Sequence, residues 1–110
     1  MASKYQYRLS QKAADDLDGI VSYIASELSN PQAAADFLSR LEKVIDEIRS
    51  FPESGAPVNN EFLSNTKLRK KTVGSYLLYY LSVPETETVY IVRIVYGKRN
   101  MEEILRQLDL

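Results

Sequence analysis

Residues 67–99 read KLRKKTVGSYLLYYLSVPETETVYIVRIVYGKR and predict three consecutive strands joined by short turns. Lys67–Val73 and Tyr76–Val83 flank the dipeptide Gly74-Ser75, and glycine in the first position of a two-residue link favours a type II′ hairpin turn. The third strand, Thr88–Tyr96, is rich in β-branched residues. This meander predicts a sheet to which the preceding part of the chain must add its own elements.

Upstream of the meander, the sequence predicts one short strand and two amphipathic helices. Tyr5–Leu9 alternates apolar and polar residues, as a half-buried strand does. Ser10 can cap the first helix, whose apolar stripe continues to Leu28. Asn30-Pro31 can open a second helix that continues to about Arg49. A link of about three residues between two such helices predicts an antiparallel helical hairpin.

The predicted order of elements is β-α-α-β-β-β followed by a short C-terminal helix. Asn100 can cap this last helix, which contains Met101, Ile104, Leu105 and Leu108. The 110 residues, of which 45% are apolar, suffice for one core and predict a single domain over residues 1–110. Neither a membrane-spanning run nor a secretory leader is recognisable, so a cytoplasmic location is expected.

The sequence contains neither cysteine nor histidine. This excludes disulfides, zinc sites with thiolate or imidazole ligands, and catalytic pairs that need a thiolate or an imidazole. Catalysis would have to use Asp, Glu, Lys, Arg, Tyr or Ser. No metal site and no cofactor are expected, because no loop has the acidic density of a calcium site.

The net charge of −1 hides an uneven distribution of charges along the chain. Residues 1–66 hold six basic and ten acidic side chains, whereas residues 67–99 hold seven basic and two acidic ones. A basic segment on a nearly neutral chain suggests a local anionic partner. The candidate residues for binding a target or a phosphate group are Arg69, Lys70, Lys71, Arg93, Lys98 and Arg99.

Each of these candidates also has a structural interpretation. Strict alternation would place Arg93 and Val95 on the same face as Val89 and Ile91, and a guanidinium in that row needs water or an anion. Arg93 would therefore mark a part of the sheet that the helices leave open and would either bind a phosphate or pair with a neighbouring carboxylate. The charges of residues 69–71 could equally protect an edge strand against aggregation.

Two further features carry both a functional and a structural interpretation. Tyr96, at the end of a strand and beside Gly97, could stack on a base or donate a proton, or could simply pack against the sheet. Cross-strand aromatic pairing is expected for most of the tyrosines in the last two strands. The loop from Phe51 to Asn65 is long enough to be functional, although a solvated connector is its commoner role.

Four stretches in this order resemble the ParE-like branch of the RelE/ParE toxins of bacterial type II toxin–antitoxin modules. They are Tyr7-Arg8-Leu9-Ser10 running into Ala13–Ile20, Phe51-Pro52-x-x-Gly55, Val73–Tyr80, and Val92–Arg99. The resemblance implies a helical hairpin packed on one face of a mostly antiparallel sheet. It also implies a cognate antitoxin that is partly disordered, wraps around the toxin, and carries most of the binding to promoter DNA.

Function within this family divides between two activities. RelE-like members resemble ribosome-dependent mRNA endoribonucleases that need no metal, whereas ParE-like members inhibit DNA gyrase. Many nuclease members carry Arg shortly after the hairpin turn, where this sequence has Tyr76, although Lys98-Arg99 matches their Gly-Lys-Arg pattern. Against ParE, Tyr96 stands where His often occurs, and Asn100 stands where Asp often occurs.

The resemblance therefore predicts a gyrase-binding toxin, with two alternatives. The first alternative is a metal-independent endoribonuclease acting on mRNA in the ribosome, with Arg93, Tyr96 and Arg99 as its catalytic candidates and no confident catalytic residue otherwise. The second is an inactive scaffold that only binds the antitoxin. No contact with a membrane is expected under any of the three hypotheses.

Overall fold

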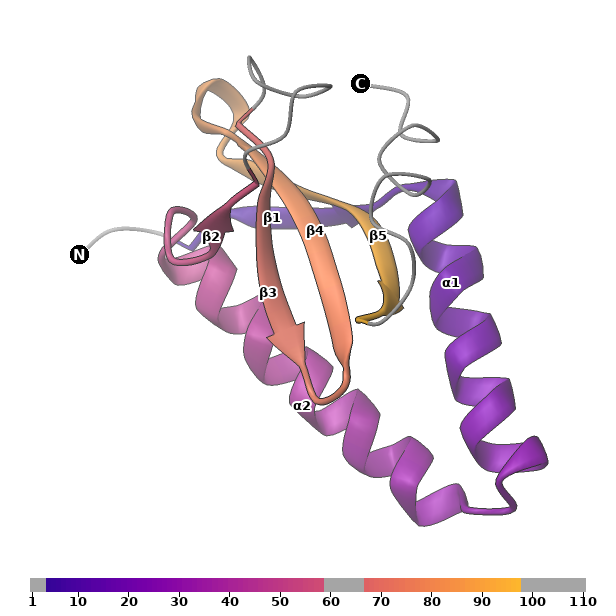
Figure 1. Cartoon of the computed structure of the whole chain (residues 1–110). Coiled ribbons are helices and arrows are strands. Elements are labelled where there is room, and N and C mark those ends of the chain that lie inside the picture. Colours follow the sequence, from indigo (N-terminus) through magenta and orange to yellow (C-terminus); the bar gives the residue numbers. More distant parts are fainter. Residues whose placement is uncertain (1–3, 59–66, 98–110) are drawn as a thin grey trace.

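The structure, a computed structural model, describes residues 4–58 and 67–97, which form two helices and a five-stranded sheet (Figure 1). The elements in chain order are β1 (Gln6–Leu9), α1 (Gln11–Ser22), the π-helical turn η1 (Tyr23–Glu27), α2 (Pro31–Ser50), β2 (Ala56–Pro57), β3 (Arg69–Val73), β4 (Tyr76–Val83), the 3-10 turn η2 (Pro84–Thr86) and β5 (Thr88–Tyr96). The strand order is β1-β5-β4-β3-β2, in which β1 is parallel to β5 and all other neighbours are antiparallel. The predicted α+β fold is confirmed.

Both helix starts lie at the predicted residues. The Ser10 hydroxyl accepts a hydrogen bond of 3.0 Å from the amide of Ala13. The Asn30 side chain accepts one of the same length from the amide of Ala33, and Pro31 occupies the first turn. Each cap satisfies an amide that has no partner within its helix, so the two starts are local properties of the sequence.

The first helix ends earlier than predicted. Regular α-helix stops at Ser22, and η1 continues as a wider turn, so that side chains after it no longer follow the apolar stripe. Leu28, predicted as the last residue of that stripe, is 55% exposed. From this point α2 diverges from α1, and the two helices form a V (Figure 1). In the described part of the chain, no helix combines the length and the apolar character that a membrane crossing requires.

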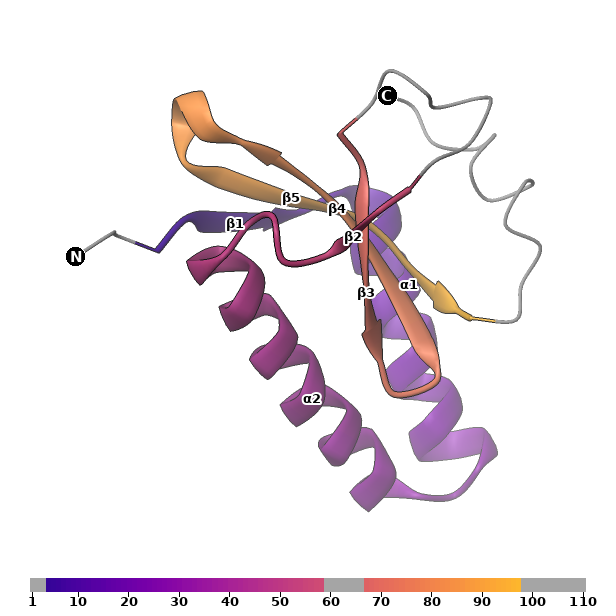
Figure 2. The same ribbon diagram turned by 60° about the vertical axis from the view of Figure 1, so that its left-hand side comes forward.

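The β3–β4 turn reaches over the helical hairpin and is seen in front of α2 in Figure 1 and in front of α1 in Figure 2, with Tyr76 directly after it packed against Phe37 of α2. Gly74 has a φ of +61°, while Ser75 is not on the positive side. This agrees with the predicted type II′ turn and excludes type I′, which needs positive φ at both central residues. The turn therefore brings the start of β4 and the end of β5 close to the helical hairpin.

Buried residues form two clusters, one on each face of the sheet. The cluster under the helices contains Ala13, Ile24, Ala34, Phe37, Leu41, Ile48, Val73, Leu78, Tyr80, Val89, Ile91 and Ile94. The cluster on the other face contains Val58, Leu68, Tyr79 and Val95, with Leu77, Leu81 and Val92 packed against it. Alternation along β4 produces this division, because successive side chains of a strand point to opposite faces.

Along β5, the prediction of strict alternation is wrong. The register between β4 and β5 shifts by one residue, so that Val92 of β5 has no partner residue on β4. Val89 and Ile91 belong to the cluster under the helices, whereas Val95 belongs to the cluster on the other face. A β-bulge of this kind adds one residue to one strand and exchanges the faces of the residues that follow. Arg93 is one of those residues.

The loop after α2 contains a strand that the sequence did not predict. Ala56–Pro57, within the predicted loop from Phe51 to Asn65, form β2 and pair with Arg69 and Lys70. The strand predicted to start at Lys67 begins at Arg69. Residues 59–66 of the loop, and the short helix predicted from Asn100, lie outside the described residues.

Candidate functional site

Three of the cations predicted to bind a target or a phosphate are engaged within the molecule. Arg69 donates hydrogen bonds to the backbone oxygens of Glu53 and Gly55, at 3.1 and 2.7 Å. Lys71 forms an ion pair with Glu47 of α2. These contacts join β3 to the end of α2 and to the turn that follows it, so both side chains have a structural role.

Arg93 is the most deeply buried of these cations, with 8% of its side chain exposed. Its Nε and Nη2 atoms donate to the two carboxylate oxygens of Asp16 on α1, at 2.8 and 3.1 Å. One of these oxygens also accepts from the amide of Ile94 at 3.0 Å. The pairing interpretation is therefore confirmed, because the anion that Arg93 needs is a carboxylate of α1.

Asp16 is a residue whose importance sequence analysis missed. The pairing of β1 with β5 ends at Leu9 and Ile91. Beyond that point, the Asp16 carboxylate accepts a hydrogen bond from the Ile94 amide of β5, which a neighbouring strand would otherwise accept. Ser10 acts similarly, because its hydroxyl donates to the backbone oxygen of Val92 at 2.9 Å. The presence of Arg93 in a mostly apolar strand indicated that a carboxylate lies nearby. The sequence did not show which of the carboxylates on α1 it is.

The remaining predicted cations lie elsewhere. Lys70 is half-buried and lies opposite Tyr79 in the register, on the face turned away from the helices. Lys98 and Arg99 lie outside the described residues. Of the predicted cations, Arg69, Lys71 and Arg93 are thus each engaged by groups of the chain itself.

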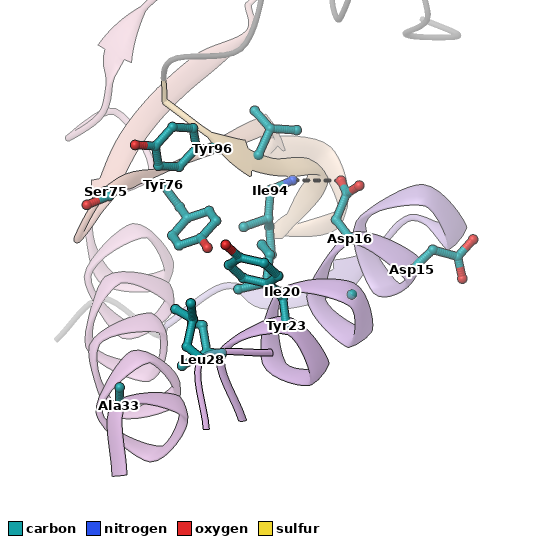
Figure 3. Close-up of a pocket in the computed structure, with 13 residues that line it drawn as sticks. Asp15, Asp16, Ile20, Tyr23, Leu28, Ala33, Ser75, Tyr76, Ile94 and Tyr96 are labelled. Atoms are coloured by element: carbon teal, nitrogen blue, oxygen red, sulfur yellow. Dashed lines mark hydrogen bonds between the residues drawn. The ribbon is translucent and has the colours of Figure 1, made fainter. Parts of the chain in front are cut away.

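A groove of about 930 Å³ lies between the helical hairpin, the start of β4 and the end of β5. Mostly apolar and aromatic side chains line it, with two carboxylates at one end (Figure 3). The lining residues are Asp15, Asp16, Gly19, Ile20, Tyr23, Ile24, Leu28, Ala33, Ser75, Tyr76, Ile94, Val95 and Tyr96. Such a surface favours an apolar, protein-like ligand over a phosphate.

Three tyrosines reach into this groove from η1, β4 and β5 (Figure 3). Tyr76 packs edge-on against Phe37 and against Tyr96, with ring centroids 5.2 and 5.8 Å apart. Burial raises the pKa of the Tyr76 phenol, and the neighbouring phenols of Tyr23 and Tyr96 raise it further. The phenol of Tyr76 therefore stays protonated, and its neutral ring packs in the groove.

Tyr96 pairs across the strands with Tyr76, as the prediction of cross-strand aromatic pairs requires. It is nevertheless 43% exposed, so its ring both packs and faces the groove. Tyr23 and Leu28 are 50% and 55% exposed at the opposite wall. The groove thus concentrates exposed apolar surface that a monomer does not need for its own core.

A family model described as the ParE toxin of type II toxin–antitoxin systems, parDE, matches residues 7–101. The chain belongs to this ParE toxin family. The resemblance recognised in the sequence is confirmed, and the chain is a toxin of the RelE/ParE superfamily. No significant match was found among curated protein sequences.

Solved structures of this superfamily share the fold. A chain of the chromosomal ParDE system from P. aeruginosa superposes with a TM-score of 0.67 and 18% identity, over 86% of this chain and 98% of that one. A chain of the RelBE2 complex from Mycobacterium tuberculosis gives 0.61 and 22%, over 86% and 99%. A chain of the intact E. coli RelBE complex gives 0.57 and 16%, over 86% and 99%. Since both ParE and RelE proteins match, the fold does not separate the two activities.

The site of this ParE-family chain is suited to binding. Within residues 4–58 and 67–97, no three acidic side chains gather in the way a metal ion requires. Asp15 at the end of the groove is exposed and accepts a hydrogen bond of 3.0 Å from Gln11, but no cation pairs with it in the described part of the chain. The groove thus offers apolar contact with a negative charge at one end.

Proposed function

We propose that this chain is a ParE-like toxin that arrests growth by binding DNA gyrase and is neutralised by a cognate antitoxin in the cytoplasm. The observation that carries the proposal is the role of Tyr76. A ring that packs between Phe37 and Tyr96 stands where the nuclease pattern has Arg, and it supplies no positive charge for a phosphate. The engagement of Arg69 and Arg93 within the fold supports the same conclusion.

A supercoiling assay with purified gyrase tests this function. Micromolar toxin is expected to inhibit supercoiling and to trap gyrase on cleaved DNA. A loss of inhibition by Asp16→Ala in the same assay is interpreted only if the circular dichroism of the variant matches that of the wild type, because Asp16 supports the fold. Undiminished supercoiling, without trapped cleavage complexes, would refute gyrase as the target.

The antitoxin is the partner that we assign to the groove. ParDE and RelBE, with which this chain shares its fold, are toxin–antitoxin systems. An amphipathic segment that orders on binding could bury its apolar side chains against Tyr23, Leu28 and Tyr96. Promoter DNA would then be bound mainly through the antitoxin. The exposed carboxylate of Asp15 would favour a basic residue at one end of that segment.

An mRNA endoribonuclease is the second candidate, and the exposure of Tyr96 at the end of β5 favours it. A translation extract programmed with a defined message separates the two functions. Cleavage at specific sites that disappears in Arg99→Ala and weakens in Tyr96→Phe would support the nuclease. Intact message and continued translation would refute it. Normal growth on expression of the chain alone would instead favour an inactive scaffold.

A further inference from the structure

Phe51 is the most exposed large hydrophobic residue of residues 4–58 and 67–97, with 69% of its surface accessible. It lies directly after α2, in the motif Phe51-Pro52-x-x-Gly55. Single exposed apolar residues are common on proteins, so exposure alone does not indicate a function. What distinguishes Phe51 is the way in which the chain around it is held.

The turn formed by residues 51–55 is fixed at several points. The amide of Phe51 donates to the backbone oxygen of Glu47 at 2.8 Å, and its own oxygen accepts from Ser54 at 2.9 Å. The Tyr80 hydroxyl donates to the oxygen of Pro52 at 2.7 Å and accepts from the amide of Gly55 at 2.9 Å. Arg69 adds its two bonds to backbone oxygens of the same turn. The backbone that carries Phe51 is therefore rigid.

Gly55 shows how closely this turn fits against the sheet. A Cβ atom at this position would lie 2.6 Å from the Tyr80 hydroxyl and 2.8 Å from the backbone oxygen of Lys70. Glycine is thus needed so that the turn can approach β3 and β4. Because the turn is already ordered, a partner that binds Phe51 would not have to immobilise a flexible loop, which otherwise weakens binding.

Beside Phe51 lies a hollow of about 330 Å³, with Tyr5, Pro52 and Pro84 among its lining residues. An exposed aromatic ring can enter a pocket of a partner protein, while the shallow hollow beside the ring accepts a side chain of that partner. Aromatic anchors of this kind carry much of the binding energy at protein interfaces. The shape around Phe51 therefore fits a folded protein surface.

The charges around the turn disfavour a nucleic acid. Arg49 donates to the backbone oxygen of Tyr5 at 2.6 Å and lies over the Tyr7 ring, and Arg69 is bound to the turn itself. Glu53 places an exposed carboxylate two residues after Phe51. A phosphate backbone would meet this negative charge with both nearby guanidinium groups already engaged. A protein pocket with a basic residue at its rim would complement it.

We propose that Phe51, with Glu53 beside it, is the element with which this toxin binds its protein target. The partner surface is an apolar pocket with a basic residue at its rim. The inference rests on the proposed function of a target-binding toxin and adds the site of binding. Phe51 and the groove residue Ala33 lie at opposite ends of α2, roughly 27 Å apart along the helix, so target and groove ligand contact different surfaces.

Supercoiling by purified bacterial DNA gyrase and growth after induction are measured for the wild type, Phe51→Ser, and two controls. Leu38→Ser removes an exposed apolar residue of α2, 39% accessible, and Tyr90→Ser removes an exposed aromatic ring of β5, 36% accessible. Thermal unfolding verifies that each variant is folded. Phe51→Ser is expected to raise the inhibitory concentration at least about 30-fold, as for an interface anchor, while both controls stay within about threefold.

The possible outcomes separate this inference from the proposed function. If Phe51→Ser inhibits gyrase as the wild type does, Phe51 is not the anchor, and the gyrase-binding function stands. If the wild type arrests growth without inhibiting gyrase, and Phe51→Ser no longer arrests growth, the anchor is supported and binds another protein. If Tyr90→Ser loses activity as strongly as Phe51→Ser, the loss is not specific to Phe51, and the anchor is refuted. A wild type without any effect refutes both proposals.

Discussion

The cations of β3 and β5 and the tyrosines of the groove have opposite roles in the molecule. Arg69, Lys71 and Arg93 attract attention in the sequence, yet each binds a group of its own chain. Tyr23 and Tyr96 resemble packing residues, yet both keep about half of their surface open in the groove. The difference shows that an unusual charge can indicate a structural need, whereas the surface available to a partner is built from ordinary aromatic residues.

The strongest test of this contrast removes the partner of Arg93. Asp16→Ala leaves a buried guanidinium without its carboxylate and the amide of Ile94 without an acceptor. We expect the free energy of unfolding to fall by about 3–5 kcal/mol, the usual cost of breaking a buried pair from one side. Denaturant unfolding measures this loss. Asp18→Ala, an exposed carboxylate on the same helix, is the control, and an equally small effect of both variants would mean that Arg93 is not structural.

A smaller loss of stability is expected for Tyr80→Phe. The change removes the hydroxyl that joins the oxygen of Pro52 to the amide of Gly55 and leaves both buried groups without this partner. The expected cost is about 1–3 kcal/mol. Thermal unfolding of Tyr80→Phe is compared with that of Tyr90→Phe, whose phenol lies on an exposed position of β5. Equal melting temperatures would show that the turn at residues 51–55 is held by other contacts.

Tyr23→Ser should separate binding from stability in the groove. Because Tyr23 is half exposed, we expect unfolding to change by no more than about 0.5 kcal/mol. Binding of the cognate antitoxin should weaken at least about tenfold, as for loss of an interface aromatic. Isothermal titration calorimetry measures the affinity, with Tyr90→Ser as a control outside the groove. If Tyr23→Ser binds the antitoxin with unchanged affinity, the antitoxin does not bind to this surface.

The smallest expected effect is a dependence on alkaline pH. The pKa of Tyr76 is raised above the ordinary value of 10.0, chiefly by burial, so the folded chain keeps this proton after the unfolded chain has lost it. The resulting stability is complete below pH 10 and is lost as the pH rises through the raised pKa. Burial also raises the pKa of Tyr79, so absorbance of the phenolate should show one late-titrating tyrosine fewer in Tyr76→Phe than in the wild type. Identical titrations of the two proteins would contradict the burial of this phenol.

Most of the fold could be predicted because its signals are local. Ser10 and Asn30 bind amides three residues away, and Gly74 adopts the positive φ that its turn requires. The alternation of side chains along β4 places Leu78 and Tyr80 under the helices. These features depend on neighbours in the chain and need no knowledge of how distant segments pack.

The candidate site could be predicted only in part. The pairing of Arg93 with Asp16 joins residues that are 77 positions apart, and the bulge at Val92 depends on how β5 pairs with β4. The groove arises because η1 turns the chain away from α1 and because the β3–β4 turn brings Tyr76 toward the hairpin. None of these contacts leaves a periodic signal in the sequence.

The sequence by itself therefore determined the order of the two helices and of the four strands other than β2, the helix caps and the β3–β4 turn, the absence of thiol and imidazole chemistry, and the resemblance to the ParE toxins. These depend on residue type and on short-range geometry. Only the tertiary structure decided which charges are satisfied and which tyrosines remain accessible. The reason is physical: a side chain can bind another molecule only if the folded chain does not already bury it or engage it with a group of its own.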